Sequence, residues 1–315
     1  MMDCKKPRIV FMGTPAFAST ALEALIKDGQ DIALVLSQPD KPKGRGQHVQ
    51  VSKVKKLALD HQIEVLTPAT LKDDIIIEKL KKAKADLFIV AAYGKILPKA
   101  VLDIPPLGCI NIHASLLPSL RGAAPINRAV MEGHIKGGIT IMYMDEGIDT
   151  GDIILQEEID INTDMTAGEY HDRLAMLGGK LIIEYLGRLQ KGDIQRKPQD
   201  NSRATYANKI EKSDCIVTFQ MTAEQTINQI RGLNPYPCAY SLLNGKRVKI
   251  RKAEPSNGKG EPAKILSVGK RGIEVACSDG SIVITELCKE GKRIMSAEEY
   301  LRGNTVKAGA YFNEQ

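Results

Sequence analysis

Two polar side chains interrupt the apolar segment Gly108–Ser115, which we predict to be a strand. Because side chains alternate along a strand, Ile110 and Ile112 would face one way, and Asn111 and His113 the other. An amide and an imidazole would then lie side by side at the carboxyl end of the strand, where open α/β sheets bind their ligands. This pattern predicts that Asn111 and His113 belong to an active site.

A carboxylate can join them from a loop that follows a later strand. Residues 144–152 (MDEGIDTGD) combine glycines and acids, which is typical of a tight polar loop at the ligand-binding edge of a sheet. Loops from neighbouring strand ends can bring Asp149 to His113. A carboxylate beside the ring would favour the protonated imidazole, which is the better hydrogen-bond donor. We therefore predict Asn111, His113 and Asp149 as the catalytic groups.

Strands and helices that alternate over the first two-thirds of the chain would position these groups. Thr166 and Glu169 fit a capping box at the start of a long helix that reaches Gln190. The alternation predicts a doubly wound, Rossmann-like α/β domain with a mainly parallel sheet. The expected strands are Arg8–Met12, Asp31–Ser37, Glu64–Leu66, Asp86–Ala92, Gly108–Ser115, Ile139–Met144 and Ile153–Ile159. Shorter helices are expected after Pro15 through Ile26 and over Ser52–His61, Asp73–Lys82 and Pro125–Glu132.

The chain changes character after Lys191. Residues 191–208 are polar and have no sustained period, so we predict a linker there. Beyond a helix at Thr222–Arg231, short apolar stretches are separated by turns such as Asn244-Gly245, which is typical of hairpins. We predict a small antiparallel barrel of the OB type. The predicted domains are thus a catalytic domain at residues 1–190, a linker at 191–208 and a β-barrel domain at 209–315.

The composition fits a folded protein of a reducing compartment. The chain has 315 residues, of which 43% are hydrophobic, so wholesale disorder is excluded. No two of its six cysteines have the CxxC spacing of a zinc knuckle or dithiol pair. The longest apolar run, Leu87–Tyr93, is too short to cross a bilayer, and Ile9–Met12 fits a first strand better than a signal peptide. We expect a cytoplasmic protein.

The net charge of +6 is concentrated in the last third of the chain. Residues 209–315 contain 17 Lys and Arg against 12 Asp and Glu, whereas residues 1–208 contain 27 against 26. Arg247, Lys249 and Arg251 alternate with Val248 and Ile250, so the basic residues would share one face of a strand. A basic stripe on a barrel suits contacts with an RNA backbone, although a solvated strand has the same pattern.

The residues alone leave two other classes open. A Rossmann-type oxidoreductase fits the α/β alternation, but the amino-terminal segment lacks Gly-x-Gly-x-x-Gly, and Asn111 and His113 would have no role. A non-catalytic RNA-binding protein fits the basic carboxyl-terminal part but leaves the Asn/His/Asp set unused.

Several motifs make the chain similar to a known family. Asn-x-His-x-Ser-Leu-Leu-Pro at 111–118, Arg-Gly at 121–122 and Ile-Asp-Thr-Gly-Asp at 148–152 resemble the formyltransferases that use 10-formyltetrahydrofolate. The resemblance runs from about Arg8 to Ser296. Further motifs resemble the branch of that family that acts on methionyl-tRNA; they lie at Phe11–Ala18, Gln38–Gly46, Ala92–Pro98, Arg121–Ile126 and Asn234–Pro237.

This resemblance implies two substrate sites. The folate pocket would be shaped by Tyr93, Gly94, Ser115, Leu116, Leu117 and Pro118, where the two leucines suit a flat pteridine. The loop at residues 38–48 would enter the acceptor stem of the tRNA, and phosphate contacts would come from Lys41, Lys43, Arg45, Arg247, Lys249 and Arg251.

The resemblance also implies the substrates and partners. The co-substrate would be 10-formyltetrahydrofolate, without a metal, and the partner would be an initiator methionyl-tRNA. A membrane or an obligate protein partner is not expected. A formyltransferase acting on a small amine, such as a ribonucleotide or an amino sugar, is the closer alternative.

The implied reaction gives the three catalytic residues their roles. An amine attacks the formyl carbon, so negative charge develops on the formyl oxygen. Asn111 and His113 are the candidate donors for that oxygen. Asp149 would support the charge on His113 and relay a proton from the amine. This reaction requires no covalent enzyme intermediate.

Overall fold

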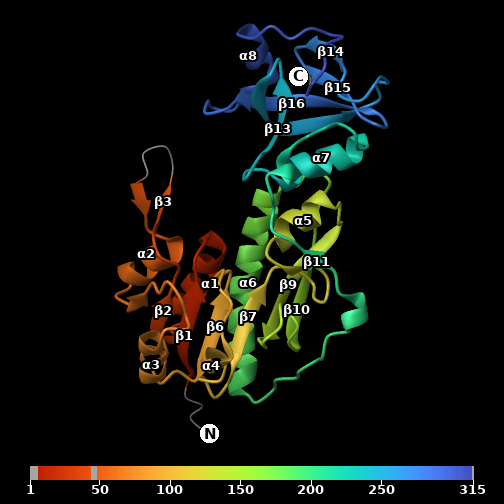
Figure 1. The fold of residues 1–315 in the computed structure, drawn as a ribbon. Coiled ribbons are helices and arrows are strands. Elements are labelled where there is room, and N and C mark those ends of the chain that lie inside the picture. The colour runs from red at the N-terminus through yellow and green to blue at the C-terminus, as the bar shows by residue number, and fades with distance from the viewer. Residues whose placement is uncertain (1–5, 44–47, 314–315) are drawn as a thin grey trace. The chain divides into compact units, whose positions relative to one another are not determined.

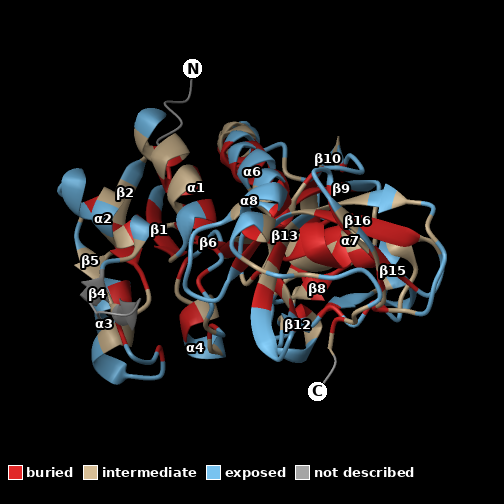
Figure 2. Cartoon of the chain, turned by 90° about the horizontal axis from the view of Figure 1, so that it is seen from above, coloured by how far each residue is buried: buried red, intermediate tan, exposed pale blue. Residues whose placement is uncertain are grey.

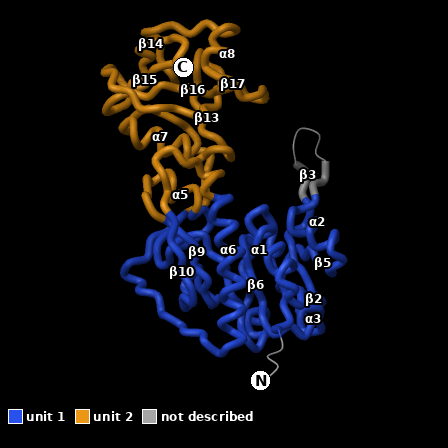
Figure 3. The backbone as a smooth tube through the Cα atoms, turned by 180° about the vertical axis from the view of Figure 1, so that it is seen from behind, with its two compact units in different colours: residues 1–125, 137–159, 171–207 blue, residues 126–136, 160–170, 208–315 orange. Residues whose placement is uncertain are grey.

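The computed structural model describes residues 6–43 and 48–313, and of residues 41–43 and 48–50 the backbone alone. The chain forms two compact units (Figure 3). Unit 1 comprises residues 1–125, 137–159 and 171–207, and unit 2 comprises residues 126–136, 160–170 and 208–315. These units interleave along the sequence, whereas the predicted domains follow one another. Residues 191–207, which were expected to form a linker, belong to unit 1.

Unit 1 is built on a seven-stranded sheet in the order β10-β9-β7-β6-β1-β2-β5 (Figure 1). The strands from β5 to β7 run parallel, and β9 is antiparallel to β7. The predicted mainly parallel sheet is therefore confirmed. Its strands are β1 Arg8–Gly13, β2 Asp31–Leu36, β5 Val65–Leu66, β6 Leu87–Ala91, β7 Cys109–His113, β9 Lys136–Tyr143 and β10 Ile153–Asp160.

Helices cover both faces of this sheet. Gly178 and Gly179 of α6 lie against Ile112 of β7 and Ala24 of α1, so α1 and α6 pack on the same face. The apolar cluster on the other face includes Cys109, Leu80 of α3 and Val101 of α4. The sheet is thus doubly wound, as predicted. The helices are α1 Ala16–Lys27, α2 Lys53–Asp60, α3 Asp74–Lys82, α4 Lys99–Leu102 and α6 Ala167–Gln190, whereas α5 Pro125–Met131 belongs to unit 2 apart from its first residue.

Side-chain caps fix where several helices begin. Ser52 and Asp73 accept backbone N–H groups at 3.0 and 2.9 Å and so cap α2 and α3. At the start of α6, the Glu169 N–H donates to Thr166 Oγ1 at 3.2 Å, and the Thr166 N–H donates to Glu169 Oε2 at 2.8 Å. The predicted capping box is therefore confirmed.

Two short strand pairs accompany the main sheets. β3 Lys41–Lys43 pairs antiparallel with β4 His48–Gln50. β8 Arg121–Gly122 pairs in parallel with β11 Tyr206–Ala207, which follows the 3₁₀ turn η1 Asn201–Arg203. The second pair explains why residues 191–207 belong to unit 1: this segment forms backbone hydrogen bonds with the loop that follows β7.

Unit 2 contains the predicted antiparallel barrel. Its strand order is β12-β13-β16-β15-β14, and β17 also pairs with β16. Tyr311 and Phe312 form bridges with Lys264 and Leu243, so one segment connects the two edges of the sheet. The strands are β12 Ala239–Leu243, β13 Lys246–Ser256, β14 Ile265–Gly269, β15 Gly272–Ala276, β16 Ser281–Lys289 and β17 Met295–Ser296; the helices are η2 Ser213–Cys215, α7 Ala223–Gly232 and α8 Ala297–Arg302.

The core of unit 2 lies between this sheet and α7, and most of α7 and of β16 is coloured as buried in Figure 2. Arg231 of α7 is 7% exposed and donates to the carbonyl groups of Asn162 and Met165 at 3.1 and 2.9 Å. Asn127 donates to the Gly232 carbonyl at 2.7 Å. These bonds attach the segments at residues 126–136 and 160–170 to the rest of unit 2. Within the described residues, no helix is long and apolar enough to span a membrane.

Candidate active site

Strand β7 presents Asn111 and His113 on one face of the sheet. Ile112 faces α6, since its Cγ2 lies where a Cβ on Gly178 would approach it to 3.0 Å. Cys109 belongs to the apolar cluster on the opposite face of the sheet. Because side chains alternate along a strand, Asn111 and His113 point to the same face as Cys109. The arrangement predicted from the sequence is therefore the one observed. Asn111 is half-buried, and His113 is 5% exposed.

Asp149 reaches both side chains from the loop between β9 and β10. Its Oδ1 lies 3.3 Å from Asn111 Nδ2 and 3.6 Å from His113 Nδ1. Its Oδ2 accepts the Gly122 N–H at 2.8 Å. The carboxylate is thus shared between the strand that carries the predicted catalytic pair and the loop that follows it.

A backbone carbonyl holds the second nitrogen of His113. His113 Nε2 lies 3.1 Å from the Leu120 oxygen. Leu120 has a φ of +59° and Asp149 a φ of +53°, a region that non-glycine residues rarely adopt. Such conformations cost about 1–2 kcal/mol each and persist only where surrounding contacts enforce them. The two ring nitrogens of His113 therefore face oxygens of Leu120 and Asp149, and both of these residues have a strained backbone.

A second layer of polar side chains surrounds the Asp149 loop. Gln199 Nε2 donates to the carbonyl oxygens of Asp149 and Gly151 at 2.9 and 2.7 Å. Arg121, 2% exposed, donates from Nη2 to Gln199 Oε1 and Asn201 Oδ1, both at 2.8 Å. Sequence reasoning missed Gln199 and Asn201, because the polar stretch around them carries no periodic or motif signal.

Hydrogen bonds also connect Thr205, which follows Gln199 and Asn201 in the chain, to the loop that contains Leu120. The Leu120 N–H donates to Thr205 Oγ1 at 2.9 Å, and the Arg121 N–H donates to the Thr205 carbonyl at 2.9 Å. The Thr205 N–H in turn donates to the Pro118 carbonyl at 3.3 Å. Residues 199–205 therefore touch both loops that surround His113, and the site is incomplete without them.

Burial keeps two nearby groups neutral. It raises the pKa of the Cys109 thiol to about 12 and that of the Tyr93 hydroxyl to about 12. The described cysteines are all free and buried, as expected of cysteines that act as small hydrophobic side chains. Near neutral pH, Cys109 is a small packed side chain and not a thiolate nucleophile.

The residues predicted to form the folate pocket have different environments. Tyr93 is 1% exposed, and its carbonyl accepts from Gln38 Nε2 at 2.8 Å. The Leu117 side chain packs with Met142 and Ile153 in a buried cluster, so a contribution of Leu117 to the predicted pocket would come from its backbone. Gly94 is exposed, Leu116 and Pro118 are half-buried, and Ser115 is buried.

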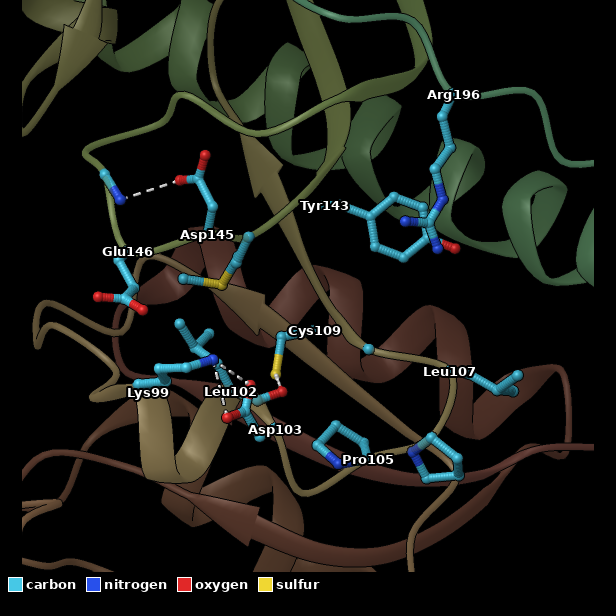
Figure 4. A pocket seen from close by; sticks show the side chains of 14 residues that line it. Lys99, Leu102, Asp103, Pro105, Leu107, Cys109, Tyr143, Asp145, Glu146 and Arg196 are labelled. Carbon is cyan, nitrogen blue, oxygen red and sulfur yellow. Dashed lines mark hydrogen bonds and ion pairs between the residues drawn. The ribbon is translucent and has the colours of Figure 1, made fainter.

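A cavity of about 690 Å³ lies beside the first residues of β7 (Figure 4). Cys109, Leu102 and Met144 are among its apolar lining residues, and Asp145 and Glu146 come from the loop that leads to Asp149. Arg196 stacks on Tyr143 at its rim, 3.6 Å from the ring centroid. None of the predicted folate residues lines this cavity.

The predicted RNA contacts lie on two segments. Lys41 and Lys43 lie on β3, where the backbone alone is described, and Arg45 lies outside the described residues. On β13, Val248 and Ile250 are fully buried and the alternate basic residues are not, as predicted. The basic stripe comprises Arg247, Lys249 and Arg251.

Two members of this stripe also contact protein. Arg247 lies 3.9 Å over the Tyr240 ring and 3.3 Å from Glu290. Arg251 Nη1 donates to the Pro235 carbonyl at 2.8 Å. Lys249 is half-buried. Among the residues that the structure describes, no group of three or more His, Cys, Asp or Glu has a metal-binding arrangement.

Comparisons with known proteins cover nearly the whole chain. Residues 7–186 match a family model described as formyl transferase, and residues 209–305 match formyl transferase, C-terminal domain. Methionyl-tRNA formyltransferase of Acetivibrio thermocellus is 45% identical over 305 residues, covering 96% of this chain and 98% of that protein. The protein of the same name from Clostridium acetobutylicum is 47% identical over 305 residues, with the same coverage.

A solved structure shows the same fold. The sugar 3N-formyl transferase WlaRD, crystallised with dTDP and 5-N-formyl-THF, aligns with a TM-score of 0.65 and 20% identity. The alignment covers 92% of this chain and 100% of that one.

Proposed function

The chain belongs to the formyl transferase family, and from that premise we propose that it formylates the α-amino group of methionine on an initiator tRNA, with 10-formyltetrahydrofolate as donor. The observation that carries the proposal is the position of Asp149 Oδ1, 3.3 Å from Asn111 Nδ2 and 3.6 Å from His113 Nδ1. An amide, an imidazole and a carboxylate at one point supply hydrogen-bond donors and a proton acceptor together.

In the proposed reaction, the amine nitrogen attacks the formyl carbon on the folate nitrogen. A new N–C bond forms, and charge develops on the formyl oxygen. The bond to the folate nitrogen then breaks, the amine loses a proton and the folate nitrogen gains one. Asn111 has two N–H groups, of which one faces Asp149, so the other can donate to the charged oxygen. Removing one such donor typically lowers the rate by about 10²–10³.

His113 supplies the second donor. Its Nδ1 lies 3.6 Å from Asp149 Oδ1, which is too long for a hydrogen bond, so this contact can be exchanged for the formyl oxygen. With a proton on Nε2 the ring donates to the Leu120 oxygen, and a proton on Nδ1 could be donated to the formyl oxygen, where it would stabilise the developing charge.

Asp149 takes the proton that the amine releases, directly or through a water molecule. An α-amino group has a free pKa of about 7.7–8.0, so part of it is neutral without a strong base. Positioned proton transfer contributes about 10²–10⁴ to the rate. The reaction needs no covalent enzyme intermediate, and Cys109 is not suited to form one, because burial raises the pKa of its thiol to about 12.

We place the folate beside the loops that follow β6 and β9. The apolar surface for a pteridine comes from Ile96 and Ile148, which are 82% and 61% exposed. Ile148 precedes Asp149, and Ile96 follows Gly94 by two residues. Backbone groups of Tyr93, Gly94 and the 115–118 segment supply polar contacts, while Leu117 serves packing. The cavity next to Cys109 is a neighbouring space on the same face of β7.

The tRNA would contact the basic residues named above. Lys41, Lys43 and Arg45 would meet the acceptor stem, and Arg247, Lys249 and Arg251 would meet backbone phosphates. Arg251 keeps part of its guanidinium on the Pro235 carbonyl, so we expect it to contribute least of the three. A protein of translation that uses folate would act in the cytoplasm.

Formyl transfer from 10-formyltetrahydrofolate tests this proposal when methionyl-tRNA and free amines are compared as acceptors. We expect formylation of methionyl-tRNA and none of uncharged tRNA, ribonucleotide amines or amino sugars. Transfer to a small amine in preference to methionyl-tRNA would place the chain in another branch of the family. Binding of tRNA without any transfer would refute the catalytic assignment.

A further inference from the structure

Gln199 uses both ends of its carboxamide. Its Nε2 donates to the carbonyl oxygens of Asp149 and Gly151 at 2.9 and 2.7 Å. Its Oε1 accepts from Arg121 Nη2 and Nε at 2.8 and 3.2 Å. One neutral side chain, from a segment about fifty residues away, therefore connects the Asp149 loop with the loop that follows β7.

The Asp149 loop needs such a support to keep its shape. Asp149 has a φ of +53°, a region that non-glycine residues adopt only where surrounding contacts hold them there. Gly151 lies close against Tyr143, because a Cβ at this position would overlap the Tyr143 carbonyl oxygen. The two carbonyl groups that Gln199 binds flank this strained turn. Loss of both bonds would free the backbone that aims the Asp149 carboxylate.

Arg121 completes the connection. It is 2% exposed, and the two oxygens bound by its guanidinium are the amide oxygens of Gln199 and Asn201. The next residue, Gly122, donates its N–H to Asp149 Oδ2 at 2.8 Å. Asp149 is thus held at its backbone by Gln199 and at its carboxylate by Gly122, and Arg121 connects the two points.

We propose that Gln199 is a positioning residue that holds the 149–151 turn so that Asp149 faces Asn111 and His113. It does not touch the reacting atoms; it acts through the two hydrogen bonds that it donates. The consequence for rate rests on the proposed formyl transfer, while the consequence for geometry does not. The competing explanation is that Gln199 only satisfies the buried Arg121.

The substitution Gln199→Glu separates these explanations, because it keeps the shape of the side chain. A glutamate still accepts from Arg121, and more strongly, but it cannot donate to the two carbonyl groups. Gln199→Met removes both functions at similar volume and adds no charge, so it covers the case in which the glutamate variant does not fold. Gln195→Glu, an exposed position in the same segment, is the matched control for the charge change.

The first measurement is the steady-state rate of formyl transfer, with the concentrations of 10-formyltetrahydrofolate and methionyl-tRNA varied in turn. We expect kcat to fall by about 10–100-fold in Gln199→Glu and Gln199→Met, because small displacements of a reacting group have effects of this size. The KM for each substrate should stay within about threefold, and Gln195→Glu should match the unaltered chain. A Gln199→Glu rate within twofold of the unaltered chain, with loss only in Gln199→Met, would show that Gln199 serves Arg121.

The second measurement is hydrogen exchange of the Gly122 amide, which reports whether Asp149 still occupies its place. We expect faster exchange by at least about tenfold in Gln199→Glu and no change in Gln195→Glu. Unchanged protection of Gly122 would overturn the positioning role whatever the activity. If the unaltered chain transfers no formyl group, the proposed function fails, and this exchange experiment still decides the role of Gln199.

Discussion

The substitution Asp149→Asn isolates the charge of the catalytic carboxylate from its shape. In the structure, Oδ2 accepts the Gly122 N–H at 2.8 Å, and Oδ1 faces Asn111 Nδ2 at 3.3 Å and His113 Nδ1 at 3.6 Å. An asparagine has one oxygen and one NH₂ for these two places. Whichever way it is oriented, a donor faces a donor on one side.

The two orientations set the size of the effect. With the oxygen on Gly122, the NH₂ group faces Asn111 and His113, so the backbone hydrogen bond is kept and the proton acceptor is lost. With the NH₂ group on Gly122, a hydrogen bond is replaced by a donor–donor contact that costs about 1–3 kcal/mol. We expect the first orientation, a loss of stability of no more than about 1–3 kcal/mol, and a fall in kcat of about 10²–10⁴ because positioned proton transfer is lost.

Single-turnover formylation of methionyl-tRNA, together with folate binding, tRNA binding and urea unfolding, measures these quantities separately. Asp193→Asn, an exposed position of unit 1, is the control for the same change of charge. We expect unaltered dissociation constants for both substrates in each variant. A kcat within tenfold of the unaltered chain would refute the role of Asp149 in proton transfer, and a matching loss in Asp193→Asn would point to a general charge effect.

Other substitutions test the remaining roles. His113→Ala should lower kcat by about 10²–10³ and leave tRNA binding intact; binding lost with the rate preserved would contradict the role of a donor. Arg45→Ala should weaken formylation of tRNA and spare folate binding, measured by titration of each substrate. Arg247→Ala should reduce the salt dependence of tRNA binding, log Kd against log[salt], by about 0.7–0.9, and an unchanged slope would exclude a phosphate contact. Burial raises the pKa of Cys109 to about 12, so the native thiol should resist iodoacetamide at pH 9. Rapid labelling of Cys109 in the folded protein would contradict this raised pKa. In the unfolded chain the thiol ionises from about pH 8.5, so the free energy of unfolding should fall between about pH 8.5 and about pH 12, by up to about 1.4 kcal/mol per pH unit. The fall should be smaller in Cys109→Ala.

The interleaved units affect how the proposed RNA contacts of unit 2 can be tested. Residues 126–136 and 160–170 belong to unit 2, and Arg231 and Asn127 hold them there. A chain cut after residue 208 would therefore remove the partners of two segments that remain. Point substitutions on β13, such as Arg247→Ala, leave both units intact and are the better test.

Local patterns predicted a large part of the fold. Alternation along residues 109–113 placed Asn111 and His113 on one face, since the period of a strand is fixed by its backbone. Thr166 and Glu169 predicted the start of α6 because a capping box forms within four residues. Val248 and Ile250 predicted the buried side of β13 in the same way. Each of these features depends only on residues that are close in the sequence, so the local sequence is enough to predict it.

Contacts between distant segments could not be predicted in this way. Gln199 lies in a polar stretch with no periodicity, and its partners are the carbonyl groups of a turn about fifty residues away. Leu120 and Asp149 adopt positive φ values although neither is a glycine, so composition gives no sign of the turns they make. The Leu117 side chain packs with Met142 and Ile153, a contact between distant segments that its place in the sequence does not reveal.

The sequence by itself therefore determined the face and spacing of Asn111 and His113, the two side chains proposed as catalytic on β7, the type of each domain's sheet and the resemblance to a family. Only the tertiary structure decided how Asp149 is aimed at them. That aim depends on Gly122, Gln199 and Arg121, whose hydrogen bonds form between segments brought together by folding. Short-range preferences act within a few residues, whereas the direction of a carboxylate in a strained turn is set by whatever the completed fold packs against it.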